Sequence, residues 1–270
     1  MFYLFFIALP LIVLAVFLYR WFQRQSRRNT LLATPLTAEQ RQIVDKLVPI
    51  THHLPEELRP ALEGKMNLFL DQITFHGNGI EITEEMKLSI AAQACLLVLN
   101  SPSWYDTLRT VLIYPTAFHS RHQRRDGYVV SEQDNIVLGE SWARGPVILS
   151  WPHALQGGLD DHDGHNVVIH EFTHQLDELT GSTNGIPVLR KGQAYEAWEK
   201  AMLDAFGAHV ARVEHGRKTL IDPYGATGHE EFFAEAIVTF FEKPNALRRE
   251  EPALYAQFSE LLALDPAEWG

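Results

Sequence analysis

Within the segment Val167-Val-Ile-His-Glu-Phe-Thr-His-Gln-Leu-Asp177, the pentapeptide from His170 to His174 places two imidazoles and one carboxylate on an apolar background. Residues four apart on an α-helix lie about one turn apart on the same face, so His170 and His174 can reach a single metal ion. The spacing His-Glu-x-x-His is typical of catalytic zinc sites, in which the glutamate takes a proton from a water molecule held at the metal. The segment therefore predicts His170 and His174 as zinc ligands and Glu171 as general base.

The residues around this segment favour a buried helix over 166–179. Apolar side chains recur at helical spacing, Gly164 precedes them and Gly181 is the expected stop. Burying two histidines and a glutamate without partners would be costly. Catalytic zinc is therefore favoured over two alternatives that stay open, a core helix without metal and a purely structural metal site.

Composition limits the remaining classes of function. A chain of 270 residues with 46% hydrophobic residues can form one sizeable core. The formal charge of −11 repels a phosphate backbone, so we expect no direct nucleic-acid partner. Cys95 is the only cysteine, which excludes an internal disulfide and a thiolate zinc cluster.

The amino-terminal residues 2–19 carry no charge and are almost wholly apolar, which predicts a membrane anchor. Positive charges follow this span: Arg20, Arg24, Arg27 and Arg28. By the positive-inside rule, we expect a single-pass protein of a bacterial inner membrane with a cytoplasmic catalytic domain. The alternative is an amino-terminal helix that packs on a partner protein. The expected segments are an anchor at 1–22, a basic linker at 23–36 and a zinc peptidase domain at 37–270.

Periodicity predicts an α+β fold in which helices surround a small mixed sheet. Helices are expected at 37–48, 54–70, 83–99, 166–179, 193–209, 230–241 and 252–264. Strands are expected at 110–114, 128–130, 136–138 and 147–151. The last strand precedes the predicted metal helix, and we expect it to be a sheet edge that pairs with extended substrate.

A catalytic zinc ion usually has three protein ligands, so a further donor is needed. Glu231 is the strongest candidate, because it lies in a nearly apolar run where a carboxylate would be buried. Glu235 lies one turn later and is either a competing ligand or an acceptor for a ligating histidine. Glu196 and Glu199 stand 22 and 25 residues after His174, but their amphipathic surroundings are typical of a solvated face.

Three further features bear on the predicted site. Asp177 could accept a hydrogen bond from a ligating histidine, and a capping or surface role is an equal alternative. Tyr224, in a turn seven residues before Glu231, could stabilise the oxyanion of a tetrahedral intermediate or could be a packing residue. Histidines that precede the metal helix could line the cleft or be merely solvated: His153, His162 and His165.

These residues together resemble the Mlc titration factor A family of zinc peptidases. The resemblance rests on residues 170–177, on Gly181, Asn184, Gly185 and Pro187, and on Tyr224 seven residues before Glu231-Phe-Phe-Ala234. The spacing from tyrosine to glutamate is also similar to that in the anthrax lethal factor protease domain. The resemblance seen over most of residues 40–265 implies a zincin-like domain.

For this chain the resemblance implies zinc ligands His170, His174 and Glu231, general base Glu171 and transition-state donor Tyr224. It also implies aminopeptidase-type activity on peptide or protein substrates and, in enteric relatives, binding to the repressor Mlc. The amino-terminal anchor departs from the soluble relatives. The rival hypothesis is a membrane-anchored binding protein that holds a transcriptional repressor, with hydrolysis weak or incidental.

Overall fold

The computed structural model describes the backbone of residues 2–126, 129–137, 139–141 and 145–269, and the side chains of these residues except in 2–11, 118–137 and 140–141. The helices are α1 (Phe2–Ala33), α2 (Ala38–Leu47), α3 (Arg59–Gln72), α4 (Glu84–Leu97), α5 (Trp151–Leu159), α6 (Val167–Asp177), α7 (Tyr195–Glu214), α8 (His229–Glu242), α9 (Pro244–Glu250) and α10 (Pro252–Leu262). Short 3₁₀ helices are η1 (Pro49–His52), η2 (Glu178–Thr180), η3 (Pro223–Thr227) and η4 (Pro266–Glu268).

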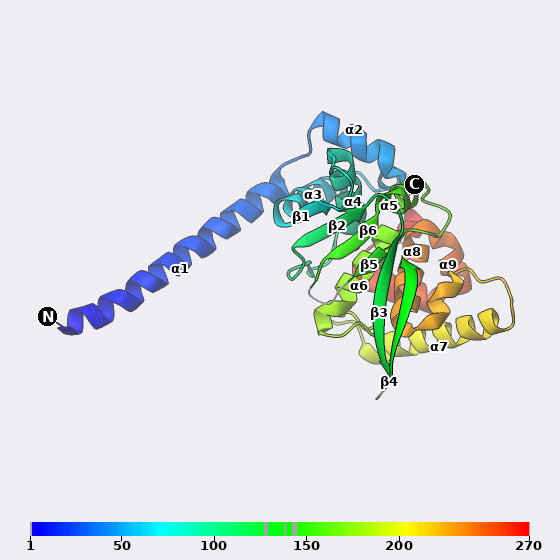
Figure 1. Cartoon of the computed structure of the whole chain (residues 1–270). Coiled ribbons are helices and arrows are strands. Elements are labelled where there is room, and N and C mark those ends of the chain that lie inside the picture. Colours follow the sequence, from blue (N-terminus) through cyan, green and yellow to red (C-terminus); the bar gives the residue numbers. More distant parts are fainter. Residues whose placement is uncertain (1, 127–128, 138, 142–144, 270) are drawn as a thin grey trace.

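A small mixed sheet lies beside the helices. Its strands are β1 (Thr74–Gly77), β2 (Thr110–Tyr114), β6 (Val147–Ser150) and β5 (Gly139–Ser141), in that spatial order. The first three are parallel, and β5 pairs antiparallel with β6. The predicted class, helices around a small mixed sheet, is confirmed (Figure 1).

The expectation that strand 147–151 forms a sheet edge is wrong. β6 lies between β2 and β5, and all four of its residues are buried. The chain first leaves β2, forms a separate hairpin of β3 (Phe118–Asp126) and β4 (Val129–Val137), and returns as the edge strand β5. The hydrophobic periodicity of the sequence does not predict that the chain returns to the sheet as β5. The order in which strands pair depends on backbone hydrogen bonds, which every residue type except proline can form.

Other helices and strands differ from those predicted from the sequence, for local reasons. The strands expected at 128–130 and 136–138 are parts of the single strand β4, and its partner β3 lacks apolar alternation. α5 was not expected because it contains a proline and two glycines. Gly157 has a packing role there, since a Cβ atom at this position would lie 2.9 Å from the Cα atom of Asn166. The close approach places α5 against the start of α6.

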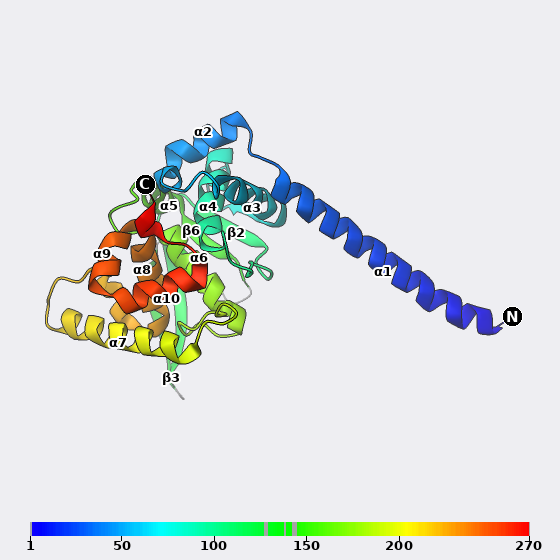
Figure 2. The ribbon, with the colours of Figure 1, turned by 180° about the vertical axis from the view of Figure 1, so that it is seen from behind.

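Aromatic side chains of the core pack behind the face of α6 that carries His170 and His174. Phe172 is fully buried and packs against Phe69 and Tyr105, with ring centroids 5.6 and 5.2 Å apart. α8 contributes Phe233, whose ring lies against Trp198 of α7 at 5.7 Å. Helices α7, α9 and α10 pack around α8 on the side away from the sheet (Figure 2). The two helices that carry the predicted ligands are therefore held by large apolar contacts.

α1 extends away from the body of the protein, and its carboxyl-terminal part packs on α3 (Figure 1). Arg27 of α1 forms an ion pair with Asp71 of α3. Residues 23–33 of the expected linker continue this helix. The predicted anchor, residues 2–19, falls largely on residues 2–11, whose side chains lie outside those described. Within the described part of the chain, no helix combines the length and apolar character that crossing a bilayer requires.

Candidate metal centre

The helix that carries the predicted motif is fixed at both ends. Asn166 caps α6 by accepting a hydrogen bond from the backbone N–H of Ile169 at 2.9 Å, and its side-chain amide donates to the carbonyl of Gly157 at 2.8 Å. After η2, Gly181 takes a left-handed conformation with φ of 93° and ends the helical segment. The start and stop expected from the sequence are confirmed, and the motif sits on a buried, well-anchored helix.

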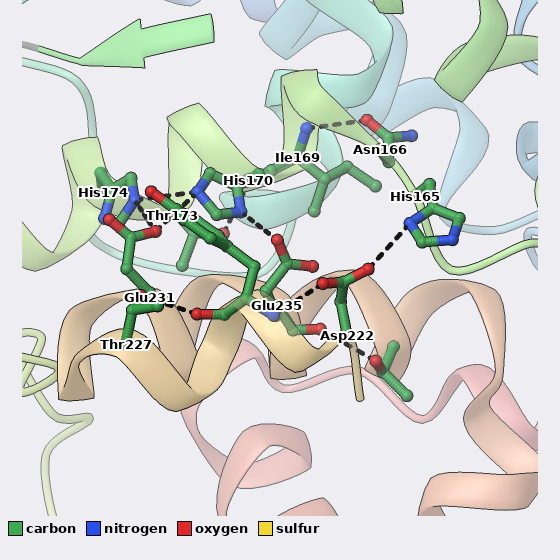
Figure 3. Close-up of polar contacts among 12 residues, drawn as sticks. His165, Asn166, Ile169, His170, Thr173, His174, Asp222, Thr227, Glu231 and Glu235 are labelled. Carbon is green, nitrogen blue, oxygen red and sulfur yellow. Dashed lines mark hydrogen bonds and ion pairs between the residues drawn. The ribbon is translucent and has the colours of Figure 1, made fainter. Parts of the chain in front are cut away.

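Three donor atoms from two helices converge at one point. His170 Nε2 lies 3.1 Å from His174 Nε2, and Glu231 Oε2 of α8 lies 3.1 and 3.4 Å from these two nitrogens. Figure 3 shows the imidazoles on α6 facing the carboxylate across the gap between the helices. The side chains retain 12%, 11% and 21% of their full exposure, in the order His170, His174 and Glu231. The structure thus brings together the three predicted ligands, although Glu231 lies 57 positions after His174 in the chain.

The donors fit a divalent metal of the zinc type. Glu231 Oε2 is buried, and Nε2 of His170 and Nε2 of His174 lie 3.1 and 3.4 Å from it. Two imidazole nitrogens and one carboxylate oxygen form the mixed N/O set that Zn²⁺ binds in catalytic sites, with positions left for water and substrate. A carboxylate buried in this way is costly without a cation, so the geometry is that of a metal-binding group.

Glu235 contacts the other nitrogen of the His170 ring from the one that Glu231 contacts. Its Oε1 atom lies 3.0 Å from Nδ1 of His170, on the opposite side of the imidazole ring from Glu231. A carboxylate at this position orients the ring and holds the proton on Nδ1, which leaves Nε2 free to bind a metal. The geometry favours Glu231 over Glu235 as the ligand and gives Glu235 the supporting position.

The charges of the site depend on one another. Burial disfavours the charged form of His170, but its hydrogen bonds with Glu231 and Glu235 outweigh burial and raise the pKa of His170 well above its ordinary value. Burial also disfavours the ionised form of Glu231, but its hydrogen bonds with His170 and His174 lower its pKa. The site therefore keeps an ionised carboxylate beside a positive charge. A bound divalent cation would supply the positive charge beside Glu231 in place of the proton on the imidazole of His170.

Glu171 is buried, with 5% of its surface exposed, and packs against strand β5. Gly139 of β5 makes this possible, because a Cβ atom at position 139 would lie 2.6 Å from Glu171 Oε1 and 2.6 Å from a methyl group of Val167. The sequence prediction missed Gly139. A glycine next to a predicted strand is a known sign of close approach, and that signal could have identified it.

Tyr224 lies at the rim of the group. Its backbone N–H donates to the Asp222 carboxylate at 2.8 Å in the turn of η3, and its ring centroid is 6.1 Å from that of His170. The tyrosine is 53% exposed, so it is not a core packing residue. Burial of the hydroxyl and the negative charges of nearby glutamates raise the pKa of Tyr224. The phenol is therefore protonated at neutral pH and can donate a hydrogen bond.

Asp177 is fully buried, so the alternative of a surface role is wrong. Its Oδ2 atom accepts a hydrogen bond from the backbone N–H of Gly185 at 2.6 Å, which holds the loop that follows η2. Oδ1 of Asp177 and Nδ1 of His174 are both buried and, among the described groups, have no hydrogen-bond partner. The predicted hydrogen bond between Asp177 and a ligating histidine is therefore not formed in this structure.

The remaining candidates lie away from the three donors. Glu196 and Glu199 are exposed on α7, as the amphipathic pattern indicates. His153 pairs with the hydroxyl of Ser150 at 2.8 Å, and His165 lies 3.3 Å from Asp222 (Figure 3). His162 lies 3.1 Å from Asp161. None of the three histidines belongs to the group formed by His170, His174 and Glu231, as far as the described residues show.

Comparison with known proteins agrees with this site. The model of the family described as glucose-regulated metallo-peptidase M90 matches residues 21–262. The chain belongs to this family. An uncharacterized protein of Synechocystis sp. is 40% identical over 244 residues, covering 89% of each chain. Mlc titration factor A is 30% identical over 227 residues in Klebsiella pneumoniae strain 342 (82% of this chain, 84% of the relative) and 31% identical over 225 residues in Escherichia fergusonii (81% and 84%).

Membership of the M90 family confirms the resemblance to Mlc titration factor A and supports a metallopeptidase-family protein. The family implies a metal, and the chain holds residues able to bind one. The matched region contains α6 and α8 entirely, so all three converging donors lie within it.

Replacement of Glu231 tests whether the converging donors hold the metal. We expect Glu231→Ala to weaken metal binding by more than the roughly 10–100-fold that loss of an outer-shell partner causes. The neighbouring Glu230→Ala is the matched control, because its side chain is not part of the donor group. Metal content is measured by mass spectrometry after equilibration with Zn²⁺ and desalting. Equal metal content in the two variants would contradict the assignment of Glu231.

Proposed function

We propose that this member of the M90 family is a zinc-dependent peptidase with ligands His170, His174 and Glu231. The observation that carries the proposal is the convergence of two imidazole nitrogens and one buried carboxylate oxygen within 3.4 Å of one another. Glu171 follows directly on the first ligand and provides a base that a purely structural metal site does not need.

The residues of the site supply the steps of peptide hydrolysis. When bound, Zn²⁺ supplies a Lewis acid that polarises the scissile carbonyl and lowers the pKa of water. Glu171 takes the proton from the attacking water and carries it to the leaving amine. Tyr224 donates a hydrogen bond to the oxygen that becomes negative in the tetrahedral intermediate. Glu235 keeps the imidazole of His170 in the orientation required for binding.

The substrate is a peptide or protein. The edge strand β5 lies beside Glu171 and offers a backbone edge to which an extended peptide can add as a further strand. The family resemblance favours an aminopeptidase-type reaction, in which a peptide with a free amino terminus is the substrate. Comparing amino-terminally blocked and free peptides of one sequence checks this preference.

A second candidate function follows from the relatives named Mlc titration factor A, whose name says that they titrate Mlc. By analogy, the chain would bind a transcriptional repressor and hydrolysis would be incidental. The two candidates differ in their need for Glu171. A cellular effect that survives Glu171→Gln together with repressor capture would favour the binding function.

We further propose that residues 2–19 attach the protein to a bacterial inner membrane, with the catalytic domain in the cytoplasm. The apolar sequence and the arginines at 20, 24, 27 and 28 support this arrangement. Several large apolar side chains on the described part of α1 are more than half exposed: Ile12, Val13, Phe17, Tyr19 and Phe22. Such a surface is unusual unless lipid or another protein covers it.

Glu171→Gln tests the base. We expect zinc content to equal that of the wild type and kcat to fall by about 10²–10⁴-fold, because the amide cannot accept the proton of the attacking water. Turnover of a fluorogenic peptide is measured in the samples used for metal analysis. Glu199→Gln, on the exposed face of α7, is the control and should keep full activity. Wild-type turnover in Glu171→Gln would reject the assignment.

Tyr224→Phe tests the oxyanion donor. We expect kcat to fall by about 10²–10³-fold with little change in KM or metal content, since the hydrogen bond forms only as the oxyanion develops. Tyr195→Phe removes the hydroxyl of another exposed tyrosine and should have no effect. An unchanged kcat in Tyr224→Phe would show that the hydroxyl takes no part in the reaction.

Alkaline carbonate extraction tests the attachment to the membrane. We expect the intact protein to stay with the membrane pellet after both a carbonate wash and a high-salt wash, because the apolar segment is held by lipid and not by charge. Release by carbonate would show that α1 is peripheral or bound to a protein partner.

A further inference from the structure

A second group of metal-ligating side chains lies outside the centre formed by His170, His174 and Glu231. His53 follows η1, and Asp161 and His162 lie in the loop that joins α5 to α6. One ligand atom from each residue can be chosen so that all three lie within 4.8 Å of one another. Two chain segments 108 residues apart thus bring together two imidazoles and a carboxylate.

The carboxylate of Asp161 stands between the two imidazoles. Its Oδ1 atom lies 3.1 Å from His162 Nε2, and its Oδ2 atom lies 3.4 Å from His53 Nε2. The two imidazole ring centroids are 6.2 Å apart. Each histidine presents its Nε2 atom, the nitrogen at the end of the side chain, and each carboxylate oxygen faces a different ring.

Asp161 is buried although it lies in a loop. The residue is only 8% exposed, and Oδ2 is a buried oxygen that accepts no hydrogen bond from the described groups of the chain. A buried carboxylate oxygen without a hydrogen bond is costly, and the atoms that it faces are metal ligands by type. A cation between Asp161 and the histidines would satisfy this oxygen.

The negative charge of this loop acts on a neighbouring carboxyl group. Glu242 at the end of α8 accepts a hydrogen bond from the backbone N–H of Gly164 at 2.8 Å. Burial, together with the negative charges of Asp163 and Asp161, raises the pKa of Glu242 to about 8. Lys243 donates to the carbonyl of Asp163 at 2.6 Å and supplies one positive charge.

We propose that His53, Asp161 and His162 form a second site for a divalent transition metal of the zinc type. The N/O donor set suits Zn²⁺, Ni²⁺ or Co²⁺ better than Ca²⁺ or Mg²⁺, which prefer oxygen ligands. The histidine side chains are 43% and 75% exposed, so the metal can enter from solvent and retain water ligands. This site is independent of the proposed peptidase function.

The position of the second site, just before α6, indicates that metal binding there would stabilise the start of this helix. The loop that carries Asp161 and His162 leads directly into Asn166, the residue that caps α6. A metal ion shared with His53 would join this loop to the end of η1. Binding would therefore stabilise the folded chain at the start of the helix that carries His170 and His174.

Metal stoichiometry tests the proposal on the full chain. The protein is stripped with a chelator, equilibrated with excess Zn²⁺, desalted and analysed by mass spectrometry. We expect two zinc ions per wild-type chain and one in His162→Ala or Asp161→Asn. His52→Ala is the matched control, because His52 is the last residue of η1, directly before His53, lies 3.6 Å from Asp45 and is outside the group. It should keep both ions.

Glu231→Ala separates the two sites. It should retain one zinc ion, and added Zn²⁺ should still raise its Tm by a few degrees, because binding to the folded state stabilises it. In Glu231→Ala/His162→Ala both effects should disappear. If His162→Ala binds as much zinc as the wild type, or if His52→Ala also loses an ion, the second site is rejected. If Glu231→Ala still binds two ions, the proposed catalytic ligand fails and the second site stands.

Discussion

The packing of α8 against α6 is the constraint on which the site depends. α6 alone presents two imidazoles one turn apart, which is a pair of donors and not a catalytic set. Glu231 completes the set of three donors only because α8 packs against α6, while the aromatic residues of α8 hold that helix on α7 and α10. The polar gap between α6 and α8 is therefore backed on both sides by rigid apolar contacts, which preorganise the donors.

The small sheet contributes to the site through strand β5, which lies beside Glu171. β5 lies at the edge beside β6, and the absence of a side chain at Gly139 leaves room for the carboxylate of Glu171. Among the described strands β5 is the edge of the sheet, so it lies close to Glu171, the proposed general base, and leaves one side for pairing with a further strand. Substrate alignment and proton transfer would be coupled through this contact, since the backbone that orients a peptide also sets the position of the base.

The surroundings of α6 combine two kinds of polar group. At the carboxyl-terminal end of α6, Asp177 holds the following loop, because it accepts a hydrogen bond from the backbone N–H of Gly185. Before its amino-terminal end, Asp161 is buried beside two histidines with one oxygen lacking a hydrogen bond in the described structure. Each carboxylate keeps one buried oxygen without a hydrogen-bond partner among the described groups, but the oxygens of Asp161 face two imidazole nitrogens at 3.1 and 3.4 Å. This difference, and not the number of acidic residues, distinguishes a structural aspartate from a candidate metal site.

The sequence by itself determined the local features. The helix at His170 and His174, its stop at Gly181 and the mostly buried position of Glu231 could be predicted, because spacing, capping and apolar background act over a few residues. Tertiary structure decided which face of His170 each glutamate meets, that β6 is interior, and that Gly139 lies against Glu171. It also brought His53 to Asp161. These contacts join residues far apart in the chain, and their geometry follows from how whole helices and strands pack, which no local pattern encodes.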